Sequence, residues 1–129
     1  MTTQSPRLAR DLDVLRHAHR LTLSRDYRQL YVHGFVLPPG YNASQILVFV
    51  EIPADYPMSP PGVGKSHIYV PCGIRFMGRP LQDVHEEFPY RRGDWAWFCY
   101  RKIQWDPCQD DLVRLMELNR AYLTDPPTK

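Results

Sequence analysis

A proline-rich segment that follows a strongly apolar run constrains this chain most. Residues 46–50 read Ile-Leu-Val-Phe-Val, and residues 52–61 read Ile-Pro-Ala-Asp-Tyr-Pro-Met-Ser-Pro-Pro. The apolar, β-branched run predicts a central strand over residues 45–52, buried on both faces. Proline has no N–H group and fixes φ near about −65°, so the segment after this strand can neither extend a sheet nor enter a helix. The pattern predicts a stiff, exposed turn in which Tyr56 is the one large aromatic side chain available as an anchor.

The composition is that of one globular domain over residues 1–129, with 43% hydrophobic and 12% aromatic residues. The net charge of +2, from 16 basic and 14 acidic residues, indicates neither a nucleic-acid nor a membrane partner. No apolar run approaches the roughly 20 residues of a membrane span, and the polar N-terminus is unlike a signal peptide. We therefore expect a cytoplasmic protein, whose three cysteines are free thiols rather than a disulfide framework.

The first half of the chain predicts one helix followed by strands. Ser5-Pro6 is typical of an N-cap with proline at the first helical position, and apolar residues then recur at helical spacing, so we expect an amphipathic helix over residues 6–19. Residues 21–70 alternate apolar or aromatic runs with turn residues. This alternation predicts an antiparallel four-stranded meander, with its last strand over residues 63–69.

The second half predicts a long loop and a closing helix. Residues 72–94 are rich in glycine, proline and charge, which predicts an irregular segment that is functional or mobile. Trp95 and Trp97 alternate along a strand-like run, and we expect them to pack in the core. Asp106-Pro107 repeats the cap-plus-proline pattern, with Gln109 completing a capping box, so a helix is predicted over residues 107–124. The order of elements is that of an α+β fold.

These motifs, in this order, resemble the ubiquitin-conjugating enzyme family, and in particular its bacterial branch. Residues 53–61 resemble the family's hallmark proline turn, P-x-x-Y-P-x-x-P-P. Ile68-Tyr69-Val70-Pro71 stands where the family has an Ile-Tyr-His-Pro-Asn type segment, and Trp105-Asp106-Pro107 resembles the motif that opens the helix after the active site. The resemblance covers about residues 6–127. It implies the UBC-like α+β fold, with the active-site segment at residues 95–105.

The resemblance also implies an activity. Such an enzyme accepts a ubiquitin-like protein from an ATP-dependent activating enzyme as a cysteine thioester and transfers it to an amine of a target protein. This step needs no cofactor. Bacterial members are similar to enzymes encoded beside a ubiquitin-like protein, an activating enzyme and a JAB-type deconjugating peptidase, in operons associated with anti-phage defence.

Three cysteines compete for the role of nucleophile. Cys99 is favoured, because it lies six residues before Trp105, close to the family position, and Arg101 and Lys102 follow it. The competing interpretation is a small buried thiol between two aromatic residues. Cys108 is the alternative nucleophile, expected as the second residue of the final helix, where the helix dipole favours a thiolate. Cys72, which replaces the family asparagine, is expected to be a bystander.

Other residues are assigned smaller roles. His85 is a candidate base for the incoming amine, against the competing interpretation of a solvated loop histidine. The resemblance implies partner docking by the first helix and the proline turn, through Arg7, Arg10, Arg16, Tyr56 and Pro57, although a solvated basic face is the equal alternative for the arginines. Zinc is not expected, because no cysteine or histidine pair has ligand spacing.

A rival function is a catalytically inactive UBC-fold module that binds a ubiquitin-like protein or another partner. The replacement of the family histidine and asparagine by Val70 and Cys72 favours this rival. The cysteine ahead of Trp105 favours the enzyme.

Overall fold

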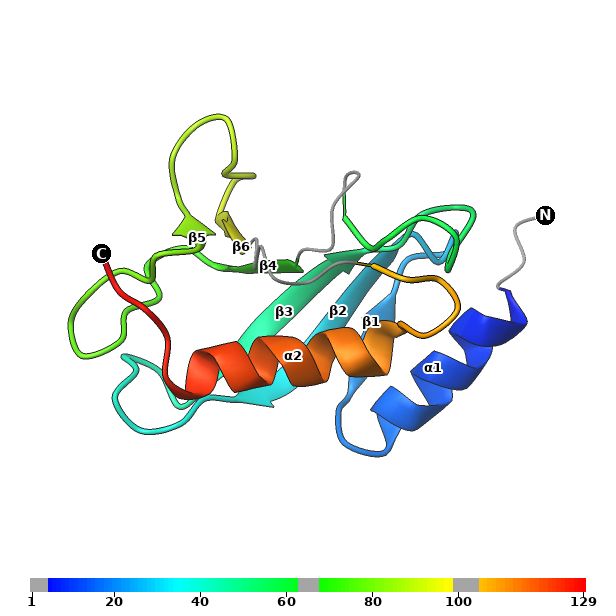
Figure 1. Ribbon diagram of the computed structural model, residues 1–129, viewed down its shortest axis with the longest axis horizontal. Coiled ribbons are helices and arrows are strands. Elements are labelled where there is room, and N and C mark those ends of the chain that lie inside the picture. Colours follow the sequence, from blue (N-terminus) through cyan, green and yellow to red (C-terminus); the bar gives the residue numbers. More distant parts are fainter. Residues whose placement is uncertain (1–4, 63–67, 99–104) are drawn as a thin grey trace.

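The computed structural model describes residues 5–62, 68–98 and 105–129 and shows an α+β protein (Figure 1). Within these ranges it contains two helices and six strands. Their bounds, in chain order, are α1 Pro6–Arg16, β1 Leu21–Leu23, β2 Gln29–Val36, β3 Gln45–Glu51, β4 Ile68–Pro71, β5 Val84–His85, β6 Trp95–Phe98 and α2 Leu112–Thr124.

The strands form one antiparallel sheet in the order β1-β2-β3-β4-β6-β5. The predicted meander corresponds to β1 to β4, but the expectation of four strands was wrong. Residues 95–98 of the expected active-site segment pair with β4, and residues 84–85 of the expected loop pair with β6. The central strand β3 is confirmed, with Val48, Phe49 and Val50 all buried. Most of the expected fourth strand, residues 63–67, lies outside the described residues.

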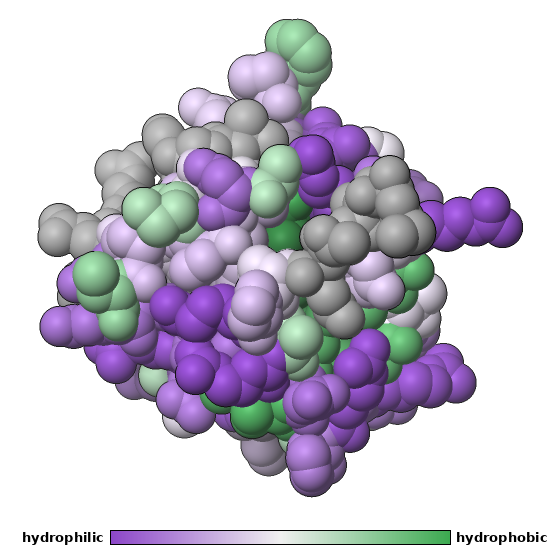
Figure 2. All heavy atoms as spheres, turned by 90° about the vertical axis from the view of Figure 1, so that its right-hand side faces the viewer, coloured by the Kyte–Doolittle hydropathy of each residue, from purple (hydrophilic) through white to green (hydrophobic). Residues whose placement is uncertain are grey.

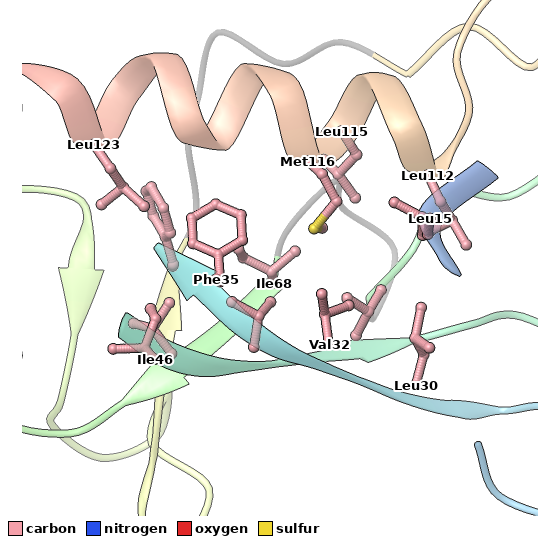
Figure 3. Close-up of a cluster of buried hydrophobic side chains, with 14 of the residues drawn as sticks. Leu15, Leu30, Val32, Phe35, Ile46, Ile68, Leu112, Leu115, Met116 and Leu123 are labelled. Atoms are coloured by element: carbon pink, nitrogen blue, oxygen red, sulfur yellow. The ribbon is translucent and has the colours of Figure 1, made fainter. Parts of the chain in front are cut away.

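Helix α2 lies across one face of the sheet, and α1 lies beside it at one end (Figure 1). The core fills the space between α2 and this face, where Phe35, Ile46 and Val32 from the sheet point toward Leu123 and Met116 of α2 (Figure 3). Burying a large apolar side chain contributes roughly 1.5–3 kcal/mol. The amphipathic pattern of the helices and the period-two pattern of the strands therefore meet in a single hydrophobic layer.

The opposite face of the sheet is aromatic. The Tyr31 and Phe49 rings stack 5.0 Å apart and the Phe49 and Tyr69 rings 5.4 Å apart, across three neighbouring strands. Trp95 adds to this row, 5.6 Å from Phe49. Arg92 lies over the Phe49 and Tyr69 rings. The expectation that Trp95 belongs to the main core was wrong: Ala96 and Phe98 fill that role, and the tryptophans alternate with them onto this face.

Both helices are shorter than predicted. Helix α1 ends at Arg16 rather than residue 19, because the N–H groups of residues 17–19 bond back to the carbonyls of Val14 and Leu15 in a closing turn. Helix α2 begins at Leu112 rather than residue 107, with Asp111 as its N-cap, whose carboxylate accepts from the Arg114 N–H. No helix in the described ranges has the length and apolar character needed to cross a membrane.

Candidate functional site

The proline turn is attached to both helices through the Tyr56 side chain. Tyr56 is 4% exposed. Its hydroxyl donates a hydrogen bond to the Asp11 carboxylate on α1 and accepts one from the Leu112 N–H at the start of α2, at 2.9 Å. The Leu112 N–H is one of the donors that a helix N-terminus leaves without an intrahelical partner. Tyr56 therefore joins the turn, α1 and α2 through one oxygen atom.

Trp105, the first described residue after position 104, contacts the same turn. Its indole Nε1–H donates to the Pro57 carbonyl at 2.7 Å, and its ring lies 6.0 Å from the Tyr56 ring. Tyr56, Pro57 and Trp105 belong to two motifs that are far apart in the chain, and the fold brings them into contact.

A closed turn, not a helix, follows Trp105. The Asp106 carbonyl accepts from the Asp110 N–H, and the Asp110 carboxylate accepts from the Asp106 N–H, each at 2.7 Å. Arg7 of α1 donates to the carbonyls of Pro107 and Asp110, at 3.1 and 2.8 Å. Because these contacts satisfy the backbone of residues 106–110 in a turn, Asp106 does not act as the N-cap that the sequence predicts. Arg7 supports this turn and is half-buried.

Cys108 lies in this turn and is exposed. Its N–H donates to the Asp106 carboxylate at 2.9 Å. The expected position at the second residue of α2 was wrong, so the helix-dipole argument for a Cys108 thiolate no longer applies.

Cys99, the favoured nucleophile, lies outside the described residues, as do Arg101 and Lys102. The residue before it, Phe98, is fully buried at the end of β6, where it pairs with Ile68 on one side and Val84 on the other. The next described residue is Trp105, whose indole N–H donates to the Pro57 carbonyl. The cysteine-bearing segment is therefore bounded by two well-anchored residues.

His85 lies on β5, the strand next to β6, and pairs with Trp97 in the sheet. Its ring packs 5.1 Å from Tyr90 and 5.8 Å from Trp97, and Nδ1 lies 3.2 Å from a Glu87 carboxylate oxygen. The structure thus holds His85 on a strand in an aromatic site, paired with a residue two positions before Cys99 in the sequence, and not in a solvated loop.

Asp83 and Tyr122 form a hydrogen-bonded pair that no sequence motif predicted. The Tyr122 hydroxyl donates to the Asp83 carboxylate at 2.8 Å and accepts from the Asp83 N–H at 3.2 Å. Its ring packs 4.9 Å from Phe98, and burial raises the pKa of the phenol. Asp83 precedes Val84, the partner of Phe98 in the sheet. Tyr122 lies on the apolar face of α2, and a buried hydroxyl needs a hydrogen-bond partner. This position was the signal in the sequence that Tyr122 would have such a partner.

Cys72 follows β4 and is half-buried, with its N–H donating to the Asp94 carbonyl at 2.9 Å. Burial raises the pKa of its thiol, and Arg91 opposes this effect. A raised pKa disfavours the thiolate, which fits a bystander better than a nucleophile. Val70, where the family has histidine, is fully buried and pairs with Ala96.

The remaining predicted docking residues lie on the outer side of α1. Arg10 and Arg16 are exposed, and Arg16 forms an ion pair with Asp13 at 3.4 Å. Hydrophilic residues cover much of the molecular face at this end, with hydrophobic residues interspersed (Figure 2). Arg10 and Arg16 therefore lie at the surface, whereas Arg7 binds the turn before α2.

Searches of protein-family models, of curated proteins and of solved structures found no match to this chain. Among the described residues, no group of histidine, cysteine and carboxylate side chains is arranged to hold a metal ion.

The buried Asp11 gives a pH-dependent prediction. Burial raises its pKa, although the Tyr56 hydroxyl opposes the shift. A raised pKa in the folded state means that the contribution of Asp11 to stability is fully present below the unfolded value of about 3.9 and is lost as the pH rises through the folded value. We expect the free energy of unfolding of the native protein, minus that of Asp11→Asn, to be larger at acidic than at neutral pH. Urea unfolding across this range measures it. Asp13→Asn controls for the loss of one exposed charge on the same helix, and a difference that rises with pH would contradict the prediction.

Proposed function

We propose that this protein is a ubiquitin-conjugating-type transferase of the bacterial kind, with Cys99 as its nucleophile. The observation that carries the proposal is the contact between the proline turn and the tryptophan motif. Trp105 and Pro57 are 48 residues apart in the chain, yet the indole binds the Pro57 carbonyl and the Tyr56 ring packs beside it. The residues that carry the family resemblance thus support one another next to the segment that contains the cysteine.

The proposed reaction has two acyl transfers. The Cys99 thiolate attacks the carbonyl carbon of the thioester between the ubiquitin-like protein and the activating enzyme, and the activating enzyme's thiolate leaves. A target amine then attacks the new thioester, the Cys99 thiolate leaves, and the amine loses a proton as the amide forms. ATP is consumed earlier, by the activating enzyme. Arg10 and Arg16 on the outer side of α1 provide a basic surface for an acidic region of that partner.

Two described side chains near the end of β6 can accept the proton from the amine. His85 lies on the strand next to β6, and Asp83 directly precedes the residue paired with Phe98. A base acts on the second transfer only, because the first exchanges one thiolate for another. His85→Gln is therefore proposed to leave formation of the thioester intact and to slow its discharge to an amine.

One observation favours the rival binding module. Val70 and Cys72 lie where the family has histidine and asparagine, and Val70 is fully buried within the sheet. No described side chain at this position offers the hydrogen-bond donor that would stabilise an oxyanion, a contribution worth about 2.7–4 kcal/mol in other enzymes. In the enzyme, backbone N–H groups would have to serve instead.

A charging assay tests the proposed function. The protein is mixed with ATP, its cognate activating enzyme and the ubiquitin-like protein, and non-reducing gels are run for native protein, Cys99→Ala, Cys108→Ala and Cys72→Ala. We expect a thiol-sensitive adduct that is lost completely in Cys99→Ala alone. The other two variants are the matched controls, since each removes one thiol elsewhere. Loss in Cys108→Ala instead would move the nucleophile, and an uncharged native protein beside a charged activating enzyme would favour the binding module.

A further inference from the structure

Four residues from three parts of the chain form a connected group just beyond the C-terminal end of α1. They are His19 and Arg20 from the α1–β1 connection, His33 from β2 and Arg120 from α2, and we call them the His–Arg cluster. The connection between α1 and β1 passes beside α2 (Figure 1), and a contact of 3.4 Å between Arg120 Nη2 and His19 Nε2 joins them.

A β-bulge directs His33 to this group. The pairing of β2 with β3 shifts between Val32 and Phe35, and Gly34 has φ of +66°, in the left-handed region that favours glycine. The His33 N–H donates to the Arg20 carbonyl at 2.9 Å, and the His33 carbonyl lies 3.1 Å from His19 Nδ1. The backbone of the bulge therefore binds the α1–β1 connection at two consecutive residues.

The hydrogen bonds define which nitrogen of each histidine ring donates and which accepts. A guanidinium can only donate, so His33 Nδ1 accepts from Arg20 at 3.3 Å, and His33 Nε2 carries the hydrogen that is donated to Thr22 Oγ1 at 2.8 Å. By the same reasoning His19 Nε2 accepts from Arg120, and His19 Nδ1–H donates to the His33 carbonyl. Each arginine is thus positioned by a ring nitrogen of one histidine.

The buried Phe35 ring supports one end of the cluster. The Arg120 guanidinium carbon lies 4.9 Å from the centroid of this ring, and the His19 ring stacks on it at 6.1 Å with an angle of 10°. Cation–π contacts of this kind orient a guanidinium while leaving most of its N–H groups free.

Arg20 and Arg120 differ from those arginines of this protein that form ion pairs with carboxylates. Arg75, Arg92 and Arg114 form ion pairs with Glu86, Glu51 and Asp110 at 2.6–2.8 Å. In the part of the chain that the structure describes, no ion pair joins Arg20 or Arg120 to an acidic side chain. Both side chains are exposed. Two oriented guanidiniums with N–H groups available to solvent suit an anion with several acceptor oxygens.

We propose that the His–Arg cluster binds a small soluble oligophosphate, with Arg20 and Arg120 each binding one phosphoryl group. The two guanidiniums are the ends of the series Arg20–His33–His19–Arg120, with two imidazoles between them. This separation favours a ligand with more than one phosphoryl group over a single phosphate. The cluster uses no residue of the proposed transferase site.

Titration calorimetry of the full chain with sodium tripolyphosphate, at physiological ionic strength, tests this proposal. We expect Arg20→Gln and Arg120→Gln each to weaken binding about tenfold, which is typical for the loss of one charge-assisted contact, and the double variant to lose it. Arg79→Gln, another exposed arginine, is the matched control and should bind like native protein. Absence of binding to native protein, native affinity in the double variant, or an equal loss in Arg79→Gln would each overturn the proposal.

Two further ligands test whether the cluster binds more than one phosphoryl group and whether its ligand is soluble. Inorganic phosphate should bind at least tenfold more weakly than tripolyphosphate, and equal affinity would overturn the assignment of one phosphoryl group to each arginine. Vesicles that contain phosphoinositides distinguish a lipid headgroup from a soluble ligand. Binding to the vesicles without binding to tripolyphosphate would overturn the soluble ligand.

Discussion

Replacing Tyr56 by phenylalanine is expected to lower the free energy of unfolding by about 2–3 kcal/mol. The change removes one oxygen atom and leaves two buried groups without their partner: the Asp11 carboxylate and the Leu112 N–H. Asp11 is 2% exposed, so the native protein cannot replace the lost bond with solvent without opening the contact between α1 and the proline turn. Urea unfolding followed by circular dichroism measures the effect.

Tyr31→Phe is the matched control for this prediction. Tyr31 is a half-buried tyrosine on the aromatic face of the sheet, and its hydroxyl has no hydrogen-bond partner within the described residues. We expect it to change stability by less than about 0.5 kcal/mol. A double-mutant cycle with Asp11→Ala separates the Tyr56–Asp11 bond from the Tyr56–Leu112 bond. Strictly additive effects would show that Asp11 and Tyr56 do not interact.

The sequence predicted the anchor but not the group to which it binds. Tyr56 was the aromatic side chain available to hold the turn, and it is buried as expected. Asp11 was not selected, although its position contained the signal. It lies three residues after Leu8 and four before Leu15, and therefore on the apolar face of α1. A carboxylate on such a face needs a hydrogen-bond donor, but the sequence does not say which of the distant donors it meets.

The start of α2 shows how tertiary contacts override a local signal. Asp106-Pro107 and Asp111 both have the residue types that cap a helix, and the cap-plus-proline pattern made the earlier position the better prediction. The structure selects Asp111, because Arg7 binds the carbonyls of the preceding turn and Tyr56 takes the Leu112 N–H. These contacts come from parts of the chain far from the helix, so no local pattern reveals them.

The two extra strands escaped prediction for different reasons. Residues 95–98 have the period-two pattern of a half-buried strand, and this was recognised as strand-like, but its pairing with β4 depends on contacts across a long loop. Strand β5 contains two residues, which is too short for any periodicity. These strands matter for the candidate site, because they place His85 beside β6 and Val84 beside Phe98.

Phe98→Ala is expected to have a larger effect on stability than Tyr56→Phe, about 3–5 kcal/mol. Phe98 is fully buried in the core. It pairs with Ile68 on one side and Val84 on the other, and its ring packs against the Tyr122 ring. Its removal leaves a cavity at the end of β6, directly before Cys99. If Phe98→Ala is too unstable to measure, Phe98→Leu, which keeps most of the volume, should cost less than about 1.5 kcal/mol.

Phe88→Ala is the matched control, with the same change of residue ten positions earlier. Phe88 is 93% exposed, so its loss should alter the free energy of unfolding by less than about 0.5 kcal/mol. Equal effects of the two substitutions would contradict the register of β6, because a shift of one residue would turn Phe98 away from the core. The comparison therefore tests the strand that leads to the proposed nucleophile, independently of any partner protein. A large loss in Phe98→Ala alone would establish that the core extends to the residue before Cys99.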